Sequence, residues 1–259
     1  LPIDRGIEVL DRDPEWTAMP GLVNCYSRIG LDSKGGNDSR PMQMASGELY
    51  PASKAYGEVL EAGVTPIALG GDHSITFPLL QAHVARHGKL SLIQFDAHSD
   101  SWVDDDPDRI DHGTFVYKAV KEGLILPEKS VAVGIRTDNP DTLGVQIIDS
   151  FEVHRSGPDA VAAKIRQIIG DTPCYLTFDI DALDPAYAPG TGTPVWGGLT
   201  SAQAAIILRE IAGLTLLGGD VVEVSPPFDT TGATAVAAAH VAMEILCLWG
   251  WTRRPGAPS

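Results

Sequence analysis

The chain has 259 residues, of which 44% are hydrophobic and 20% are charged, which is ordinary for a globular protein with a sizeable core. Its formal net charge of −15, without a basic patch, argues against nucleic acid as a partner. The same charge is compatible with a small cationic substrate.

Cys25, Cys174 and Cys247 form neither a CxxC pair nor a disulfide framework, a pattern typical of a reducing compartment. We see no secretory signal at Leu1 and no apolar run that we expect to cross a bilayer. The predicted location is therefore the cytoplasm, with no membrane partner.

Residues 1–45 are predicted to be an irregular N-terminal segment, because prolines and a turn-rich stretch interrupt any periodic pattern there. Residues 46–259 are predicted to form a single domain. In chain order, helices are expected at 53–62, 74–87, 115–122, 158–169, 201–211 and 234–249, and strands at 64–69, 90–95, 131–135, 145–148, 174–179 and 216–224. Ser74 is expected to cap the second helix, and Thr200 or Ser201 the fifth. The alternation predicts an α/β fold with three α/β/α layers and a mostly parallel central sheet.

Three short clusters of polar residues follow predicted strands, at residues 70–74, 96–100 and 179–181. Ligand sites of parallel sheets lie at the carboxyl ends of their strands. If strand geometry continued, residues i, i+2 and i+4 would point the same way, so each cluster could converge. The six candidate metal ligands are His73, Asp96, His98, Asp100, Asp179 and Asp181.

Any one aspartate after a strand is more simply explained as a helix or turn cap, but the six together favour a metal site. Oxygen and nitrogen ligands without thiolate suit Mn²⁺, and nickel or cobalt could bind the same set. Four carboxylates exceed the needs of one ion, and two ions about 3.5–4 Å apart can share and activate a water. Glu223, at the end of another strand, could pair with a cationic substrate. His112, in a loop, is a candidate proton shuttle.

The three clusters, in this order, resemble the ureohydrolase family of arginases and agmatinases. Residues 70–73, 96–100 and 179–185 match its patterns Gly-Gly-Asp-His, Asp-Ala-His-x-Asp and Asp-x-Asp-x-x-Asp-Pro. Residues 184–194, 197–200 and 222–226 are similar to the agmatinase branch in particular. The resemblance covers roughly residues 50–250 and implies an arginase-like fold, with residues 46–259 as a single ureohydrolase-like catalytic domain.

Carried over by position, the resemblance implies two Mn²⁺ ions per chain. One ion would be held by His73, Asp96, Asp100 and Asp179, and the other by Asp96, His98, Asp179 and Asp181. Asp96 and Asp179 would bridge, and Asp100 would also orient the attacking hydroxide. Glu223 would hold the guanidinium and His112 would protonate the leaving amine, giving urea and an amine. Family resemblance also implies a homotrimer or homohexamer.

The loop between Asp100 and His112 is expected to face the far end of the substrate. It is acidic over residues 104–108, which would repel a carboxylate and suit a free ammonium, so agmatine is the favoured substrate, giving putrescine and urea. Arg109 keeps 4-guanidinobutyrate, or another guanidine, open as an alternative. A plain solvated turn is the simpler interpretation of the same charges.

Two alternative functions from other classes of protein remain open. A metal-dependent deacetylase would need one zinc ion, whereas His73 and Asp100 complete a second site here. A non-catalytic subunit of a hetero-oligomeric ureohydrolase is suggested by residues 1–50, which lack the family's usual first strand and Arg-rich loop. His83 and His87, four residues apart on a helix, are expected to be solvent-exposed rather than metal ligands.

Overall fold

The computed structural model describes residues 22–24, 44–45, 56–106, 109–138 and 141–253. Within them, a seven-stranded sheet forms the centre of the molecule, and every neighbouring pair of strands is parallel. Its spatial order is β1 (Leu22–Asn24), β3 (Ile67–Leu69), β9 (Leu216–Val222), β8 (Cys174–Asp179), β4 (Ser91–Phe95), β6 (Val131–Ile135) and β7 (Gln146–Asp149). The predicted parallel α/β fold is confirmed.

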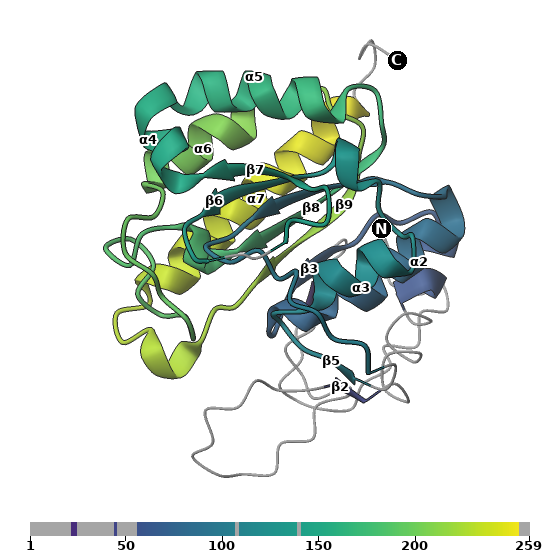
Figure 1. Ribbon diagram of the computed structural model, residues 1–259, viewed down its shortest axis with the longest axis horizontal. Coiled ribbons are helices and arrows are strands. Elements are labelled where there is room, and N and C mark those ends of the chain that lie inside the picture. Colours follow the sequence, from purple (N-terminus) through teal and green to yellow (C-terminus); the bar gives the residue numbers. More distant parts are fainter. Residues whose placement is uncertain (1–21, 25–43, 46–55, 107–108, 139–140, 254–259) are drawn as a thin grey trace, which may run out of the picture.

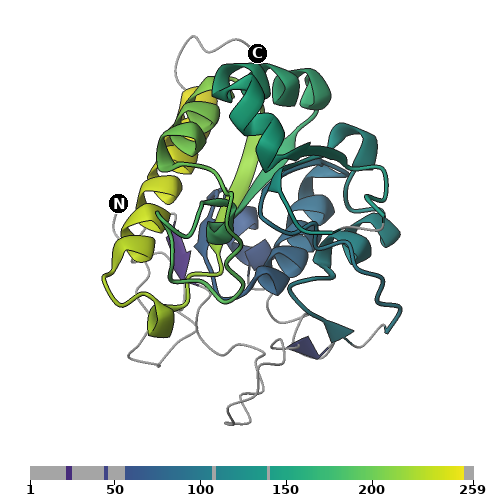
Figure 2. The same cartoon turned by 60° about the vertical axis from the view of Figure 1, so that its left-hand side comes forward.

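Helices cover both faces of this sheet. They are α2 (Thr76–His87), α3 (Phe115–Lys121), α4 (Ser150–Ser156), α5 (Pro158–Ile169), α6 (Ser201–Glu210) and α7 (Ala233–Thr252). Figures 1 and 2 show α2 and α3 on one side of the sheet, and α4 to α7 on the other. Separate apolar clusters fill the two interfaces, so the predicted three layers are present.

Alternation along each strand assigns its side chains to the two faces. In β8, Leu176 and Phe178 join the core beneath α4 to α7, whereas Tyr175 joins the core beneath α2 and α3. In β9, Val221 faces the first core and Val222 the second. Thr177 of β8 therefore shares the α2 and α3 face with Tyr175, as the two-residue period of a strand requires.

Several element boundaries differ from those expected. The strand predicted at 64–69 begins at Ile67, and α4 was not predicted at all. Asp149 starts α4, because its carboxylate accepts the amide of Glu152 at 2.7 Å. Ser74 does not cap a helix: Asp72 caps the preceding turn instead, accepting the amide of Ser74 at 2.9 Å.

The expected irregular segment at residues 1–45 falls mostly outside the described residues. Within it, β1 pairs with β3 at the sheet edge, and β2 (Met44–Ala45) pairs antiparallel with β5 (Arg109–Ile110). The single domain over residues 46–259 remains a prediction. His83 contradicts expectation: it is fully buried beside Tyr56 and Tyr175, because its position on α2 faces the sheet, whereas His87 is exposed as expected.

Helix α7 is long and apolar enough to cross a membrane by length and composition, although no such run was expected from the sequence. In the fold it lies along the sheet, where Ile245 and Val241 join the core that includes Val221 of β9. One helix of this kind does not indicate a membrane protein.

Candidate metal centre

The six candidate ligands meet at the carboxyl ends of three strands, β3, β8 and β4, with β9 between β3 and β8 in the sheet. His73 follows β3, residues 96–100 follow β4, and Asp179 is the last residue of β8. Gly70 lets the chain pack closely after β3, since a Cβ there would collide with Ile75 and with Val222 of the neighbouring strand. The predicted clustering of these side chains at one edge is thus observed.

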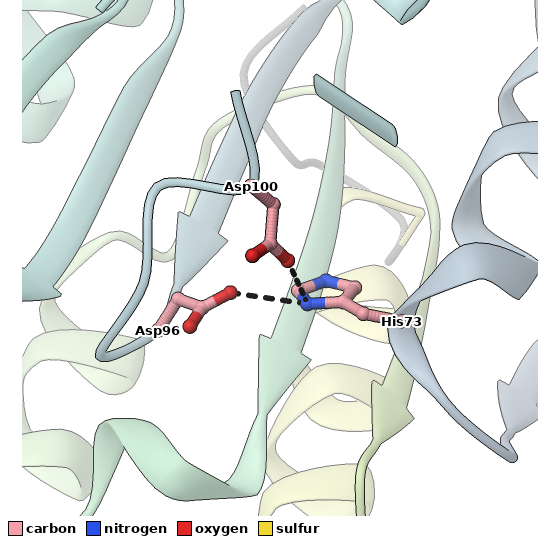
Figure 3. Close-up of side chains that lie close together, drawn as sticks. All are labelled: His73, Asp96 and Asp100. Carbon is pink, nitrogen blue, oxygen red and sulfur yellow. Dashed lines mark ion pairs between the residues drawn. The ribbon is translucent and has the colours of Figure 1, made fainter. Parts of the chain in front are cut away.

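The first group of ligands surrounds one nitrogen of His73. Its Nδ1 lies 2.9 Å from Asp100 Oδ2, 3.0 Å from Asp96 Oδ2 and 3.3 Å from Asp179 Oδ2. Figure 3 shows Asp96 and Asp100 directed at this ring. His73 is fully buried, and Nδ1 has no hydrogen-bond partner despite these three oxygens. The atoms are therefore close enough to share one cation.

The second group lies on the other side of Asp96. His98 Nδ1 is 3.1 Å from Asp181 Oδ2 and 3.5 Å from Asp96 Oδ1. Asp96 thus directs one carboxylate oxygen toward each imidazole. The two possible metal-binding groups, His73 with Asp96 and Asp100, and Asp96 with His98 and Asp181, have this carboxylate in common.

The cluster after β4 converges through a loop, not through continued strand geometry as the sequence suggested. The strand ends at Phe95, and Asp100 adopts a left-handed backbone conformation with φ of 51°. Its carbonyl accepts the amide of Val116 at 3.0 Å, which fixes this turn against α3. Strain of this kind, in a residue other than glycine, is typical of functional sites.

Neighbouring amides hold the carboxylates in place. Asp96 accepts the amide of His98 at 2.6 Å and the side-chain amide of Gln94 at 2.8 Å. Asp179 Oδ1 accepts the amide of Asp181 at 2.8 Å, and Asp181 Oδ1 accepts that of Ala97 at 3.0 Å. Each carboxylate keeps its other oxygen directed at an imidazole, except Asp96, which offers both.

The crowded carboxylates perturb one another. Burial, with the charge of Asp96 as the second cause, raises the pKa of Asp100 to about 7. Burial and the charges of Asp181 and Asp96 also raise the pKa of Asp179 well above its ordinary value. Negative charge gathered out of water in this way calls for a compensating cation.

Beside the cluster lie the two further predicted residues. Glu223 follows β9 with φ of 65°, and its Oε1 accepts the amide of His73 at 2.8 Å. His112 Nδ1 lies 3.3 Å from the same oxygen. The hydrogen bond with Glu223 raises the pKa of His112 to about 9, although burial opposes it. The imidazole is thus protonated at neutral pH, which suits a proton donor.

Four polar side chains support the centre that were not identified in the sequence. Gln94 holds Asp96, as described. Thr177 Oγ1 lies 2.8 Å from His73 Nε2 and donates to Asp220, and Arg136 donates to the backbone carbonyls of Asp181 and Val195 at 2.7 and 2.6 Å. For Gln94, Thr177 and Asp220 the signal was a polar residue inside an otherwise apolar strand, whereas Arg136 follows β6 and carried no such signal.

The acidic loop is more neutral than its sequence implied. Arg109 Nε lies 2.9 Å from Asp104 Oδ2, and its Nη2 lies 3.5 Å from Asp111. Asp105 pairs with Lys121. Ile110 is fully buried, and Asp108 lies outside the described residues. Arg109 is therefore already matched by carboxylates of its own loop.

The donor set fits divalent cations. It offers carboxylate oxygens and imidazole nitrogens without thiolate, and a buried nitrogen without a hydrogen-bond partner faces three carboxylates. An imidazole nitrogen that faces three carboxylates is stabilised by a positive charge at that point, which a bound divalent ion supplies. Fold and site together define a metal-binding α/β protein with its centre at the strand ends.

Comparison with known proteins gives the family. The sequence model described as Arginase family matches residues 32–248, and the chain belongs to this family. An agmatinase of Chromobacterium violaceum is 56% identical over 191 residues, which are 73% of this chain and 59% of that protein. The chain thus spans about three fifths of that relative's length.

Solved structures agree. The crystal structure of a hypothetical agmatinase from Burkholderia thailandensis is 54% identical and has a TM-score of 0.77, covering 78% of this chain and 65% of that one. Proclavaminate amidino hydrolase from Streptomyces clavuligerus is 33% identical with a TM-score of 0.75, covering 85% and 72%. The arginase-like fold expected from the motifs is confirmed.

Proposed function

We propose that this chain is a dinuclear metal-dependent ureohydrolase that cleaves a guanidino group to urea and an amine. The observation that carries the proposal is the pair of imidazoles, each facing carboxylate oxygens, with Asp96 common to both. A carboxylate that only caps a helix or forms one ion pair would not need to face two imidazoles.

In this proposal one ion would be held by His73, Asp96, Asp100 and Asp179, and the other by Asp96, His98, Asp179 and Asp181, so that Asp96 and Asp179 would belong to both sets. Two such ions, when bound, would supply hydroxide at neutral pH by lowering the pKa of water. Asp100, 2.9 Å from His73, would accept a hydrogen bond from a water at the centre. Mn²⁺ is the metal that this donor set favours.

Glu223 and His112 act on the guanidine itself. Glu223 accepts hydrogen bonds from the guanidinium, which orients the carbon toward the ligand cluster. His112, whose Nδ1 lies 3.3 Å from Glu223 Oε1, donates its proton to the departing nitrogen. The proton is needed because the unprotonated leaving group would be an alkylamide anion, which is too basic to leave. Water and the guanidinium thus become urea and a protonated amine.

Agmatine is the substrate we propose, with putrescine as the second product. The relatives named agmatinase support this, at 56% and 48% identity. The pairing of Arg109 with Asp104 and Asp111 supports it further, because a matched guanidinium attracts a substrate carboxylate less. Hydrolysis of 4-guanidinobutyrate or another guanidine is the alternative, and a non-catalytic subunit is the alternative of another class.

We also propose that the protein acts in the cytoplasm on a small-molecule substrate, as a homotrimer or homohexamer, and contributes to polyamine biosynthesis. The cysteines support a reducing compartment, since Cys174 and Cys247 are unpaired thiols. A single-zinc deacetylase is disfavoured, because His73 and Asp100 form a group distinct from that of His98 and Asp181.

The test is urea release by the Mn²⁺-loaded chain from equal concentrations of agmatine, arginine and 4-guanidinobutyrate. We expect agmatine to give the largest kcat/KM. A preference for 4-guanidinobutyrate would contradict agmatine as the substrate but would support guanidine hydrolysis as the reaction. Urea from none of the three, by protein that binds two ions, would contradict the proposed reaction and favour a non-catalytic subunit.

A further inference from the structure

A buried carboxylate that belongs to none of the ligand groups lies behind His73. Asp220, in β9, is fully buried and accepts hydrogen bonds from three hydroxyl groups. Thr177 donates to Oδ1 at 2.5 Å, and Tyr175 and Thr76 donate to Oδ2 at 2.8 and 3.0 Å. A buried carboxylate is expensive, so an arrangement that satisfies it so fully has a structural or functional reason.

The sheet register brings this carboxylate to the metal centre. Thr177 of β8 and Asp220 of β9 are directly opposite each other in the parallel pairing. Both side chains point to the face covered by α2 and α3, where His73 follows β3. Thr177 Oγ1 lies 2.8 Å from His73 Nε2, so the hydroxyl connects the carboxylate to the imidazole.

The direction of each hydrogen bond follows from counting protons. A threonine hydroxyl has one proton, and an ionised carboxylate can only accept. Thr177 gives its proton to Asp220 and must therefore accept from His73 Nε2–H. A neutral imidazole with its proton on Nε2 presents a lone pair at Nδ1. That is the nitrogen that faces Asp96, Asp100 and Asp179.

We infer that Asp220 is a positioning residue which, through Thr177, holds His73 in the tautomer and orientation that bind metal through Nδ1. The inference rests on the proposed metal-centred function. Metal-binding histidines commonly donate their second N–H to a carboxylate or carbonyl, and loss of such a partner typically costs about 10–100-fold in metal affinity. Here a threonine hydroxyl lies between the histidine and the carboxylate.

The test is Mn²⁺ affinity of the full chain, measured from the electron paramagnetic resonance signal of free Mn²⁺ during titration. Thr177→Val removes the hydroxyl at nearly constant shape, and we expect affinity to fall by about 10–100-fold. Thr177→Ser restores the hydroxyl and is expected to bind close to the wild-type value. Rescue by serine separates a hydrogen-bonding role from simple packing.

Asp220→Asn leaves a single acceptor oxygen for three hydroxyl donors, so we expect weaker Mn²⁺ binding there too. Because Asp220 acts through Thr177, the losses in Thr177→Val and Asp220→Asn should not add in the double variant. Tyr175→Phe is the matched control: it removes another buried donor to Asp220 without touching the hydroxyl that contacts His73. We expect its affinity to stay near the wild-type value.

The inference is overturned if Thr177→Val binds Mn²⁺ as tightly as the wild type, if the two losses add, or if Tyr175→Phe loses as much affinity as Asp220→Asn. If Asp220→Asn fails to fold, the valine and serine variants at position 177 decide. A wild-type chain that binds no Mn²⁺ overturns the proposed function and this inference together. If the wild type and all the variants bind Mn²⁺ equally well, only this inference is overturned, and the proposed function stands.

Discussion

Asp96 is the side chain on which both ligand groups depend. It is fully buried, its Oδ2 lies 3.0 Å from His73, and its Oδ1 lies 3.5 Å from His98. The hydrogen bond from Gln94 and that from the amide of His98 fix the plane of the carboxylate. These two hydrogen bonds therefore place one carboxylate between the two imidazoles.

Individual ligand types could be recognised in the sequence, whereas their supports could not. The motifs Asp-x-His-x-Asp and Asp-x-Asp are recognisable because they place typical metal-ligand residue types at the ends of predicted strands. Thr177 and Asp220 do not, since their partnership depends on which strands are neighbours and in what register. Their only local signal was polarity within an apolar strand, which the spacing of the metal ligands did not explain.

The pairing of His112 with Glu223 should depend on pH. The pKa of His112 is raised to about 9 from an ordinary value of 6.5, so the pair contributes stability fully below about pH 6.5 and loses it as pH rises through about 9. A double-mutant cycle of His112→Asn and Glu223→Gln, by chemical unfolding of the metal-free chain, should show this. We expect a coupling free energy of about 1 kcal/mol or less at about pH 6.

At about pH 10 that coupling should disappear, because neutral imidazole no longer pairs with the carboxylate. Each single variant and the double variant are measured at both pH values, so effects on the remaining charges cancel. A coupling that stays constant or grows with rising pH would show that a protonated His112 is not what Glu223 stabilises.

At the scale of elements, the site depends on how its strands end, three of them in turns or short helices. β4 passes into a turn at Asp100, β8 into a short 3-10 helix at residues 180–182, and β9 into the strained Glu223. Apolar runs in the sequence located these strands, since burial on both faces leaves a clear pattern. The same pattern says nothing about the turn that follows: the side chains lie close together, but through a loop and not through a continued strand.

Helix α6 shows how local chemistry can fix a boundary. Thr200 was one of two residues expected to cap it, and its hydroxyl accepts the amide of Gln203 at 3.1 Å while the Gln203 side chain accepts the amide of Thr200 at 3.0 Å. Thr200→Ala should lower the free energy of unfolding by about 1 kcal/mol. Ser201→Ala, one residue inside the helix, is the control and should change it little.

Chemical unfolding of both variants beside the wild type measures these differences. Metal affinity should be unaffected in each, because α6 contributes no ligand. Equal losses at Thr200 and Ser201, or no loss at Thr200, would contradict the assignment of Thr200 as the cap.

For the whole molecule, the two layers of helices cover different parts of the sheet: one an apolar core, the other a polar network behind the site. The layer of α4 to α7 buries the larger apolar core, including Phe95 and Phe178, which stack with ring centroids 5.0 Å apart. The layer of α2 and α3 covers the polar network of Thr177 and Asp220 and places Phe115 against His73 at 4.4 Å. The second layer therefore keeps water from the back of the metal centre.

In the proposed centre two ions are held jointly, with Asp179 among the shared ligands. We would first measure Mn²⁺ content per chain and urea release from agmatine together, on the wild type and on Asp179→Asn. We predict close to two ions and active hydrolysis in the wild type, and loss of both bound metal and activity in the variant. Full activity with one ion per chain, or retained turnover in Asp179→Asn, would contradict the claim.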